Sequence, residues 1–486
     1  MGYPIRNYNK PIAYRLLLVK IPTSPYNPHH RLEKIARLAF YATLILAPFR
    51  LRTVLLSRPN DDIYRDYTDF LLFLPDVAML VTLFAWGLAR RFEIKTLRLG
   101  PAYVWIPLVG LTLAALLSSI SSVDSALSFY HSIRLCALFL VYLYVVNEQT
   151  STFLISLAAG LQGALQSVVG IAQSLTQRSV GLQALGEYSL DPAWSGVSIV
   201  SDGTSRFLRA YGLTDHPNIL GGCLAFSLLI LLTAYLRSEG KHLFVTGFAF
   251  ALLSLALLMT FSRSAWLALS AGAIFIIVLE VKARGWASLK SVAPLFVLTA
   301  LVLIPFVVMN STYFAVRLNL GDEFENVRTE EQAVDERAYL NQIANKIFTK
   351  FPLTGVGMSA SPVAIKSGYG DFPTNYQPPH FALLAVALET GFFGSIFYFL
   401  LMFLPWVAFS RRADLRVNPR AIGVMGLLLA LTVVGFFDYY IWFSTPGRLW
   451  QWLAWGLFAT AIESPSPREA SPKGTGRGVR GEGELR

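Results

Sequence analysis

The chain has 486 residues, of which 54% are hydrophobic and only 15% are charged, and its formal net charge is +11. Its mean hydropathy of +0.50 lies well above that of a soluble domain, and the apolar residues occur in long blocks. This composition excludes a soluble enzyme and predicts an all-α polytopic membrane protein. The positive charge requires no nucleic acid as a partner, because Lys and Arg gather in short loops and in the C-terminal tail.

About twelve apolar segments are long enough to cross a bilayer as helices. Because long helices with short loops leave no room for a soluble catalytic domain, we expect one integral domain over 36–462. The basic segment 1–35 and the tail 463–486, rich in Pro, Ser, Gly and Arg, are expected in the cytoplasm, the tail as a disordered end. The candidate spans are 36–56, 69–89, 101–120, 126–146, 152–174, 217–236, 242–261, 264–281, 291–309, 380–405, 420–437 and 447–462.

The charge of the loops predicts which side of the membrane each one faces. Lys and Arg mark cytoplasmic loops, and here they occur in alternate loops, at 90–98, 237–241, 282–290 and 411–420. The opposite loops are short and neutral, or long and mixed in charge, as at 175–216 and 310–379. This alternation places both termini in the cytoplasm and both long loops outside.

Polar side chains inside two of the predicted spans need partners. His131 and Arg134 interrupt the fourth span, where structural pairing and a role in a site are about equally expected. Gln162, Gln166 and Gln173 fall on one face of the fifth span. This stripe predicts hydrogen bonds between helices. The cysteines, Cys136 and Cys223, lie in apolar segments and support neither a disulfide framework nor a thiolate metal site.

The loop 175–216 ends in SRFLRAYGLTDHPNILGG, where a helix begins. Arg206 and Arg209 come just before the helix, and Asn218 lies in its first turn. Two guanidinium groups near a helix N-terminus would bind an anion such as a diphosphate. A structural salt bridge to Asp202 or Asp215 is the alternative.

Arg263 stands between two apolar segments with almost no loop, in MTFSRSAWLALSAG. An arginine at the edge of the hydrocarbon needs a partner to offset its desolvation, so it marks a candidate functional site. A side chain that reaches the outer headgroups is the alternative.

The loop 310–379 begins with acidic residues and then becomes amphipathic. Tyr339, Ile343 and Ile347 repeat every four residues, which predicts a helix that lies against the bundle or on the membrane surface. Gly355 and Gly357 follow within a stretch of turn residues.

His380 lies where this loop meets a long apolar helix. Taken alone, a histidine in this position is more typical of a hydrogen-bonded helix start than of a catalyst. Glu389 lies nine residues on, about 13 Å deeper along a helix, so it should not touch the same substrate atom. The roles of Glu389 and Asp438 stay open at this point.

Several short motifs follow one another over residues 200–460. Their order and spacing on a twelve-span background resemble the O-antigen ligase and O-antigen polymerase superfamily. Phe381 departs from the usual pattern, in which a polar residue, often Asn, follows the histidine; this puts the detailed acceptor contacts in doubt. The motifs are Arg209-Ala-Tyr-Gly, His216-Pro-Asn218, Thr260-Phe-Ser-Arg263, Arg337-Ala-Tyr-Leu, Phe351-Pro-Leu-Thr-Gly-Val-Gly357, His380 and Leu388-Glu-Thr-Gly391-Phe-Phe-Gly394.

The resemblance implies a glycosyltransferase of the bacterial cytoplasmic (inner) membrane. Such an enzyme takes a glycan from a polyprenyl (undecaprenyl) diphosphate carrier and joins it to a glycolipid or glycan acceptor at the external, periplasmic face. The resemblance further implies inversion at the sugar carbon, with no metal and no cofactor. Ligation to the lipid A core, polymerisation of repeat units and transfer to a protein hydroxyl share this layout, so the acceptor stays open.

The same resemblance suggests roles for the basic residues. Arg209 and Arg263 are the expected diphosphate clamp, with Arg206 or Arg337 in support. Asn218 and Gly357 are further candidates for substrate binding. His380 is the expected general base, because a neutral imidazole is available near neutral pH; a diphosphate-binding His380 is the alternative.

A transporter of lipid-linked glycans is the alternative from another class. Such proteins tend to have internal repeats and interrupted helices with polar groups near mid-membrane. The sequence has no convincing repeat, and its basic candidates lie at outer helix ends. Both features favour a transferase.

Overall fold

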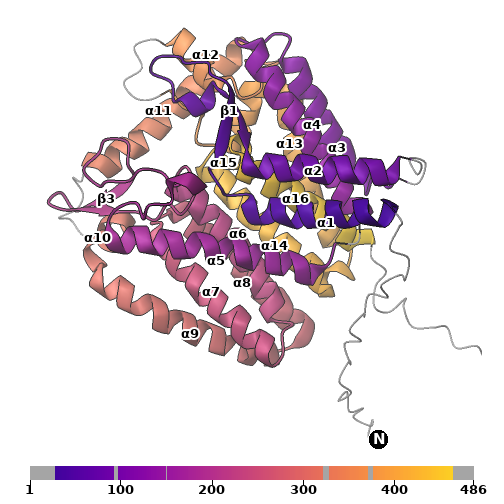
Figure 1. The fold of residues 1–486 in the computed structure, drawn as a ribbon, viewed down its shortest axis with the longest axis vertical. Coiled ribbons are helices and arrows are strands. Elements are labelled where there is room, and N and C mark those ends of the chain that lie inside the picture. The colour runs from indigo at the N-terminus through magenta and orange to yellow at the C-terminus, as the bar shows by residue number, and fades with distance from the viewer. Residues whose placement is uncertain (1–27, 92–96, 149, 321–327, 370–375, 464–486) are drawn as a thin grey trace, which may run out of the picture.

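The computed structural model describes residues 28–91, 97–148, 150–320, 328–369 and 376–463. Residues 1–27 of the predicted cytoplasmic N-terminal segment and residues 464–486 of the predicted tail therefore lie outside the described residues, whereas residues 28–35 form the start of a helix. The structure is 72% helical, with few strands. Figure 1 shows long helices packed side by side, with short strands and shorter helices gathered at one end of the bundle.

A helix occurs at each of the twelve predicted spans. Within the described residues, eight of these helices, α4 to α9, α13 and α14, are long and apolar enough to cross a membrane. The number of spans stays a prediction for the other four. The twelve helices are α1 (Pro28–Leu46), α2 (Leu74–Arg90), α3 (Ala102–Ser118), α4 (Ser125–Asn147), α5 (Thr152–Thr176), α6 (Pro217–Tyr235), α7 (Lys241–Met259), α8 (Arg263–Arg284), α9 (Ala287–Met309), α13 (Ala382–Arg411), α14 (Pro419–Phe437) and α16 (Thr445–Glu463).

The remaining elements are short or lie in the long loops. Two antiparallel hairpins pair β1 with β2 and β3 with β4. The elements are β1 (Arg52–Leu56), β2 (Phe70–Phe73), β3 (Ile199–Ser201), β4 (Arg206–Leu208), α10 (Ser311–Leu318), α11 (Arg328–Lys350), α12 (Ser361–Gly368) and α15 (Tyr440–Phe443).

The first predicted span, 36–56, was wrong at its end. Helix α1 stops at Leu46, two residues before Pro48, which cannot continue a helix. The apolar run that follows is strand β1, paired with β2 in front of α2. The apolar content of this run predicts a helix, but its β-branched residues and its pairing with β2 favour a strand.

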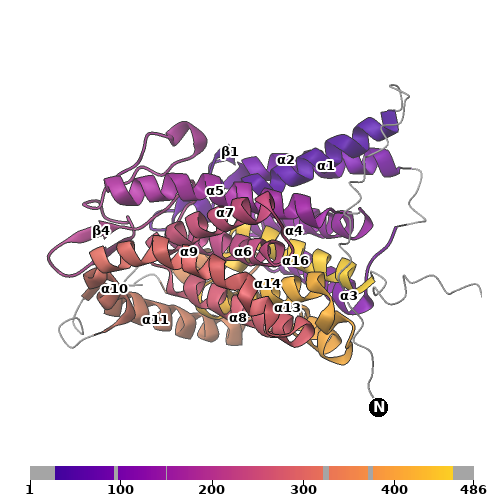
Figure 2. The same ribbon diagram turned by 90° about the horizontal axis from the view of Figure 1, so that it is seen from below.

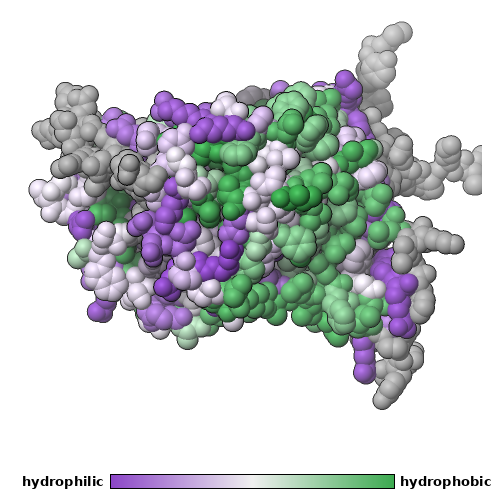
Figure 3. Space-filling model, turned by 90° about the horizontal axis from the view of Figure 1, so that it is seen from above, coloured by the Kyte–Doolittle hydropathy of each residue, from purple (hydrophilic) through white to green (hydrophobic). Residues whose placement is uncertain are grey.

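The centre of the bundle is built from helices that other helices surround. Helix α6 is the most buried of the eight candidate spans, with 78% of its apolar window inside the protein. By contrast, α9 shows only 22% of its window buried and exposes Leu301, Ile304 and Val308. Figure 3 shows hydrophobic residues covering a broad part of the surface beside a hydrophilic end. Such an exposed apolar surface is suited to lipid.

The loops separate into two sets at opposite ends, as the alternation of charge predicts. In Figures 1 and 2, β3, β4, α10 and α11 lie at one end, and the N-terminal end of α1 and the C-terminal end of α2 lie at the other. The loops predicted as cytoplasmic meet at this second end: Arg98 pairs with Glu463 at 3.8 Å, and Arg412 donates to the carbonyl of Ile462 at 3.1 Å. We call the first the site end.

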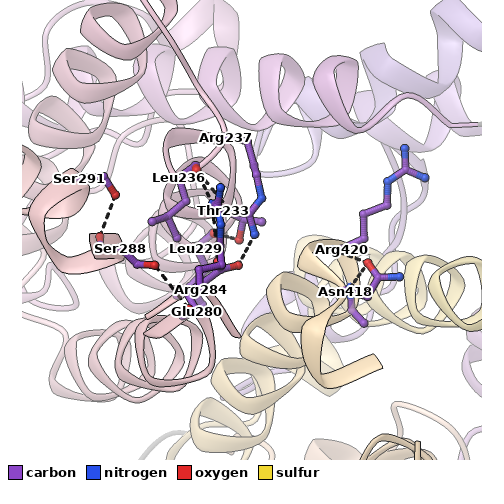
Figure 4. Close-up of polar contacts among 11 residues, drawn as sticks. Leu229, Thr233, Leu236, Arg237, Glu280, Arg284, Ser288, Ser291, Asn418 and Arg420 are labelled. Atoms are coloured by element: carbon purple, nitrogen blue, oxygen red, sulfur yellow. Dashed lines mark hydrogen bonds and ion pairs between the residues drawn. The ribbon is translucent and has the colours of Figure 1, made fainter. Parts of the chain in front are cut away.

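Glu280 of α8 joins neighbouring elements among the predicted cytoplasmic loops through its side chain and its backbone. It is only 2% exposed, and its carboxylate pairs with Arg237, which follows α6, and with Arg284. Its backbone carbonyl accepts from Oγ of Ser288 of α9 at 3.4 Å; Figure 4 also shows Asn418, which caps α14, as a separate group. Some of the basic residues that marked this side are thus part of the packing as well as of the charge pattern.

Helices α11 and α12 form a cap over the site end with a small core of their own. Leu340, Ile343 and Ile347 of α11 are at most 4% exposed and pack with α12 and the start of α13. Tyr339, predicted on the same face, is instead 40% exposed. Ile343 and Ile347 thus lie on the buried face as predicted, and Leu340 takes the place of Tyr339 in an i, i+3, i+7 pattern.

Candidate functional site

The loop between β4 and α6 carries Arg209, and glutamines of α5 hold it in place. Gln173 accepts hydrogen bonds from two successive backbone N–H groups of the loop, at 3.2 and 2.8 Å. Gln166 accepts from the N–H of Leu213 at 2.7 Å. The glutamine stripe was predicted to join helices; these two members instead fix a loop, which limits the conformational freedom of Arg209.

Arg209 is 5% exposed and joins two segments that are distant in sequence. Its Nε donates to the carbonyl of Thr260 at 2.6 Å, and its Nη2 donates to Oδ1 of Asn218 at 2.6 Å. Thr260 directly follows α7, and Asn218 lies in the first turn of α6. The guanidinium group is therefore held at the site end by residues at the ends of two helices.

The carboxylates considered as salt-bridge partners of Arg209 have other partners. Asp202 accepts hydrogen bonds from Thr204 and Ser205 within its own turn. Asp215 pairs with two arginines of the segment before and within β1, Arg50 and Arg52.

Asn218 connects Arg209 to a buried carboxyl group. Its Nδ2 donates to Oδ2 of Asp438 at 2.9 Å, while its Oδ1 accepts from Arg209. Asp438 directly follows α14 and is 4% exposed. Burial raises the pKa of Asp438, and the positive charge of Arg337 opposes this rise.

The turn between α7 and α8 brings two more arginines to the site. Phe261 has a φ of 48°, in the left-handed region that a side chain rarely adopts. Its carbonyl accepts a hydrogen bond from Nε of Arg317 at 2.8 Å, and Nη1 of Arg263 donates to the carbonyl of Arg317 at 3.3 Å. Arg263 is the first residue of α8 and Arg317 lies in α10, so this strained turn is fixed from both sides.

His380 lies just before α13, with its ring edge against Tyr439. The ring centroids are 4.8 Å apart at an angle of 88°. Nδ1 of His380 is buried and has no hydrogen-bond partner among the described residues. Burial, with the charge of Arg337 in addition, lowers the pKa of His380 to about 3, so the imidazole is neutral near neutral pH.

A second histidine, His216, lies at the start of α6, and the charge of Arg337 acts on it as well. Its Nδ1 accepts from the N–H of Asn218 at 3.1 Å, which caps the helix. Burial lowers the pKa of His216 well below its ordinary value, as do the nearby charges of Arg209, Arg337 and Arg317.

These contacts and electrostatic effects define one group of side chains at the site end. We call Arg209, Arg263, Arg317, Arg337, His216 and His380 the arginine–histidine cluster. Its members come from the loop before α6 and from α8, α10, α11 and the start of α13. The positive end of the α6 helix dipole adds to four guanidinium charges, so the cluster is suited to a multiply charged anion.

Gly357 packs closely against other segments of the protein. Its φ is 105°, and a Cβ there would lie 2.0 Å from Oγ of Ser122. Its N–H donates to the carbonyl of Glu389 at 3.0 Å, and that of Val356 donates to the carbonyl of Leu388 at 2.8 Å. These contacts position the loop against α13; no described contact places Gly357 in the arginine–histidine cluster, and its role in substrate binding stays a prediction.

Glu389 is fully buried and holds the same loop through its side chain. Its carboxylate accepts from the N–H of Ser359 at 2.9 Å, from Oγ of Ser361 at 2.7 Å and from Nε1 of Trp442 at 2.8 Å. Arg448 of α16 donates to Oγ of Ser359 at 2.8 Å. Through these partners Glu389 positions the loop against α13 and α16, and the expectation that it does not touch the reacting atoms stays a prediction.

Two other arginines singled out in the sequence make separate contacts. The exposed Arg206 donates to the carbonyls of Pro192 and Ala193, at 3.1 and 3.3 Å. Arg134 pairs with Asp76 of α2 at 2.7 Å, which is the structural pairing considered for it. None of these contacts joins either arginine to the arginine–histidine cluster.

Sequence reasoning missed Arg317 and Tyr439 as members or neighbours of the site, and it left the role of Asp438 open. Arg317 stands alone in TYFAVRLNL, the same signal that singled out Arg263. Asp438 and Tyr439 end an apolar helix, but only the fold shows that they meet Asn218 and His380.

Among the described residues, no group of three or more His, Cys, Asp or Glu side chains could hold a metal ion. Residues 248–399, which carry most of the cluster, match the family model described as O-antigen ligase. Over this segment the chain is similar to O-antigen ligases. The match confirms the resemblance to the O-antigen ligase and polymerase superfamily and, together with the apolar helices, supports a membrane enzyme of the O-antigen ligase type.

The matched segment does not contain the whole arginine–histidine cluster. Arg263, Arg317, Arg337 and His380 lie within the matched residues, whereas Arg209 precedes them. Asn218 also precedes the match, and Asp438 follows it. No curated protein matches the chain.

Proposed function

We propose that the protein is a glycosyltransferase that moves a glycan from a polyprenyl diphosphate carrier to an acceptor hydroxyl outside the cytoplasmic membrane, as in ligation of O-antigen to the lipid A core. The arginine–histidine cluster is the observation that carries this proposal. Four guanidinium groups and two imidazoles meet at one end of an apolar helix bundle. A lipid-linked diphosphate has both features that this arrangement favours, an anionic head and an apolar tail.

The reaction requires little of the protein beyond binding and orientation. The acceptor oxygen attacks the anomeric carbon, the bond from that carbon to the diphosphate oxygen breaks, and the polyprenyl diphosphate leaves with the bonding electrons. Arg209, Arg263 and Arg317 would balance the charge that develops on the leaving oxygens. Attack from the face opposite the diphosphate inverts the carbon.

His380 is the proposed general base. Its Nδ1 lies buried without a described partner, and the neutral ring can accept the hydroxyl proton of the acceptor. The bound diphosphate would bring negative charge to the site and make the imidazolium form more stable. A His380 that donates to the diphosphate is the alternative role, and the two roles predict different effects on donor binding.

Two other activities of the superfamily, and transport of the donor, are alternative functions for the same site. A repeat-unit polymerase or a protein O-oligosaccharyltransferase would use the same donor chemistry with a different acceptor hydroxyl. A transporter of lipid-linked glycans would bind the donor without breaking its glycosidic bond.

A transfer assay separates these functions. The purified protein in liposomes would receive one labelled polyprenyl diphosphate glycan with lipid A core, a second lipid-linked repeat unit or a Ser-rich protein as acceptor. We expect the label on lipid A core, with release of polyprenyl diphosphate. Label on another acceptor would reassign the function within the superfamily. Movement of the intact donor across the bilayer without release would contradict the proposal.

A further inference from the structure

A pocket of about 470 Å³ opens in the long loop before α6. Its wall includes Arg50, Gln183, Tyr188, Trp194 and Ser195. This volume falls within the range of pockets that bind small organic ligands. None of these residues belongs to the arginine–histidine cluster.

The lining residues combine aromatic faces with uncharged hydrogen-bonding groups. The Trp194 side chain is 55% exposed in a polar loop, and Tyr188 lies beneath the guanidinium group of Arg50 at 4.5 Å. A sugar ring presents a face of C–H groups and a rim of hydroxyl groups. An aromatic platform with hydroxyl and amide side chains around it complements both parts.

The charges at the pocket are already paired, which disfavours a free anion as the ligand. Arg50 forms an ion pair with Asp215. Glu187 is 3% exposed and accepts from the N–H of Val180 at 2.7 Å and from Nε2 of Gln173 at 2.9 Å. With both charged groups held by the chain, a neutral polyhydroxylated ligand fits the pocket better than a phosphate.

The pocket is preformed because the loop has a small core of its own. Leu190, Leu208 and Tyr211 are at most 3% exposed, and Tyr188 and Val197 pack against them. A pocket that keeps its shape without ligand loses less conformational entropy on binding.

One layer of side chains separates the pocket from the arginine–histidine cluster. The ring of Tyr188 stacks on Tyr211 with centroids 6.0 Å apart, and Tyr211 lies 6.3 Å from His216. Ser198, which follows the pocket residue Val197, bonds Nε2 of His216 through its Oγ at 2.8 Å. A glycan of several sugars whose reacting end lies at the cluster is long enough to span this separation.

We propose that this pocket is a saccharide subsite that holds a sugar of one substrate's glycan chain away from the reacting bond, with Trp194 as its stacking platform. The inference rests on the proposed glycosyl transfer at the cluster. The sugar can belong to the donor glycan or to the acceptor, and the chemistry of the pocket is the same for both.

Direct binding tests the subsite without requiring turnover. The full-length protein would be titrated with two soluble oligosaccharides: the glycan released by mild acid from the host's polyprenyl diphosphate carrier, and the deacylated lipid A core. We expect one of them to bind and Trp194→Ala to weaken that binding about tenfold, with Trp194→Phe close to wild type. Which oligosaccharide binds identifies the donor or the acceptor as the source.

Kinetics supply the second arm and the control. Trp194→Ala should raise KM for the long-glycan substrate about tenfold with kcat unchanged, and should leave a donor with a single sugar unaffected. Trp286→Ala, at a tryptophan 75% exposed at the start of α9, is the matched control and should change neither value. If neither oligosaccharide binds, or if Trp194→Ala alters neither binding nor KM, the subsite is wrong.

These outcomes are separable from those of the proposed function. Oligosaccharide binding that depends on Trp194 in a protein that transfers no glycan would keep the subsite and reject the transferase. Transfer that is insensitive to Trp194→Ala would keep the transferase and reject the subsite.

Discussion

Buried arginines at the site end hold the chain together and, in the proposed function, also bind the substrate. Nε of Arg209 and Nε of Arg317 are each bonded to a carbonyl of the turn after α7. The hydrogen bond at Nε fixes the orientation of each guanidinium group. A guanidinium group fixed in this way is already ordered before a diphosphate arrives, so less entropy is lost on binding.

Arg263 and His380 should differ in the step that each supports. We expect Arg263→Ala to weaken binding of the lipid diphosphate and to lower transfer about 100-fold or more, because a charge-assisted contact in a dry site is worth several kcal/mol. Arg263→Lys should restore little, since a point charge cannot replace the bidentate fork. His380→Ala should abolish turnover while donor binding stays near wild type. Donor affinity and single-turnover rates measure both effects.

Arg178→Ala is the matched control for these variants, because Arg178 is an exposed arginine of the long loop before α6. It should retain activity. Equal large losses of donor affinity in Arg263→Ala and His380→Ala would place His380 in the diphosphate clamp, and full activity in either variant would reject this site.

The low pKa of His380 predicts an unusual pH profile. Because the pKa in the free protein is about 3, the ring stays neutral well below pH 6.5. The acid limb of kcat/KM that belongs to His380 should therefore lie well below pH 6.5. Bound diphosphate favours the protonated ring, so the acid limb of kcat should lie at higher pH than that of kcat/KM.

Arg337→Ala offers a check on the sign of this effect. The charge of Arg337 lowers the pKa of His380, so its removal should move the acid limb of kcat/KM to higher pH. A shift in the opposite direction, or an acid limb near 6.5 in the wild type, would contradict the assignment.

At the scale of elements, α13 is interrupted where the loop that carries Gly355 and Gly357 crosses it. Gly391 has φ 72° and ψ −168°, which breaks the helix and frees the carbonyls of Leu388 and Glu389. The N–H groups of Val356 and Gly357 bond to these carbonyls, and the N–H of Phe392 bonds to Pro352. The break and the loop thus satisfy each other's backbone groups.

Gly391→Ala should therefore destabilise the protein. The new Cβ would lie 2.0 Å from the carbonyl oxygen of Leu353, and alanine would also have to adopt a positive φ. We expect a loss of about 1–3 kcal/mol or more from the backbone strain alone, measured as a lower Tm in detergent. Gly368→Ala is the control, because a Cβ at Gly368 meets nothing within 4 Å; equal Tm values for both variants would contradict this account.

The sequence was most informative where a signal is local. Apart from the first, the long apolar runs predicted helices to within about six residues of their bounds, because length and composition largely decide them. The end of α1 could not be predicted in this way, since β1 forms only by pairing with β2. The isolated arginine signal found Arg263, whereas Asp438 and Tyr439 join the site through contacts with residues more than 50 positions away.

At the scale of the whole molecule, the two sets of loops predict a fixed orientation in the membrane. Cysteines introduced at Ala193 and Gly368, both exposed at the site end, should react with an impermeant thiol reagent in intact spheroplasts. The background would lack Cys136 and Cys223. A cysteine at Glu239, in the opposite set, should react only after lysis. Labelling of Ala193→Cys and Gly368→Cys only after lysis would reverse the orientation and place the site in the cytoplasm.

The arginine–histidine cluster is assembled from segments on both sides of the matched boundary at residue 248. Arg209 and Asn218 come from before it, while the turn and Arg263 that they meet come from after it. A chimaera that exchanges only residues 248–399 with a relative would thus join two halves of a site that evolved in different proteins. Grafts meant to change substrate choice should instead take the chain from Gln166 to Asp438 as one block, so that each arginine arrives with the carbonyls and amides that orient it.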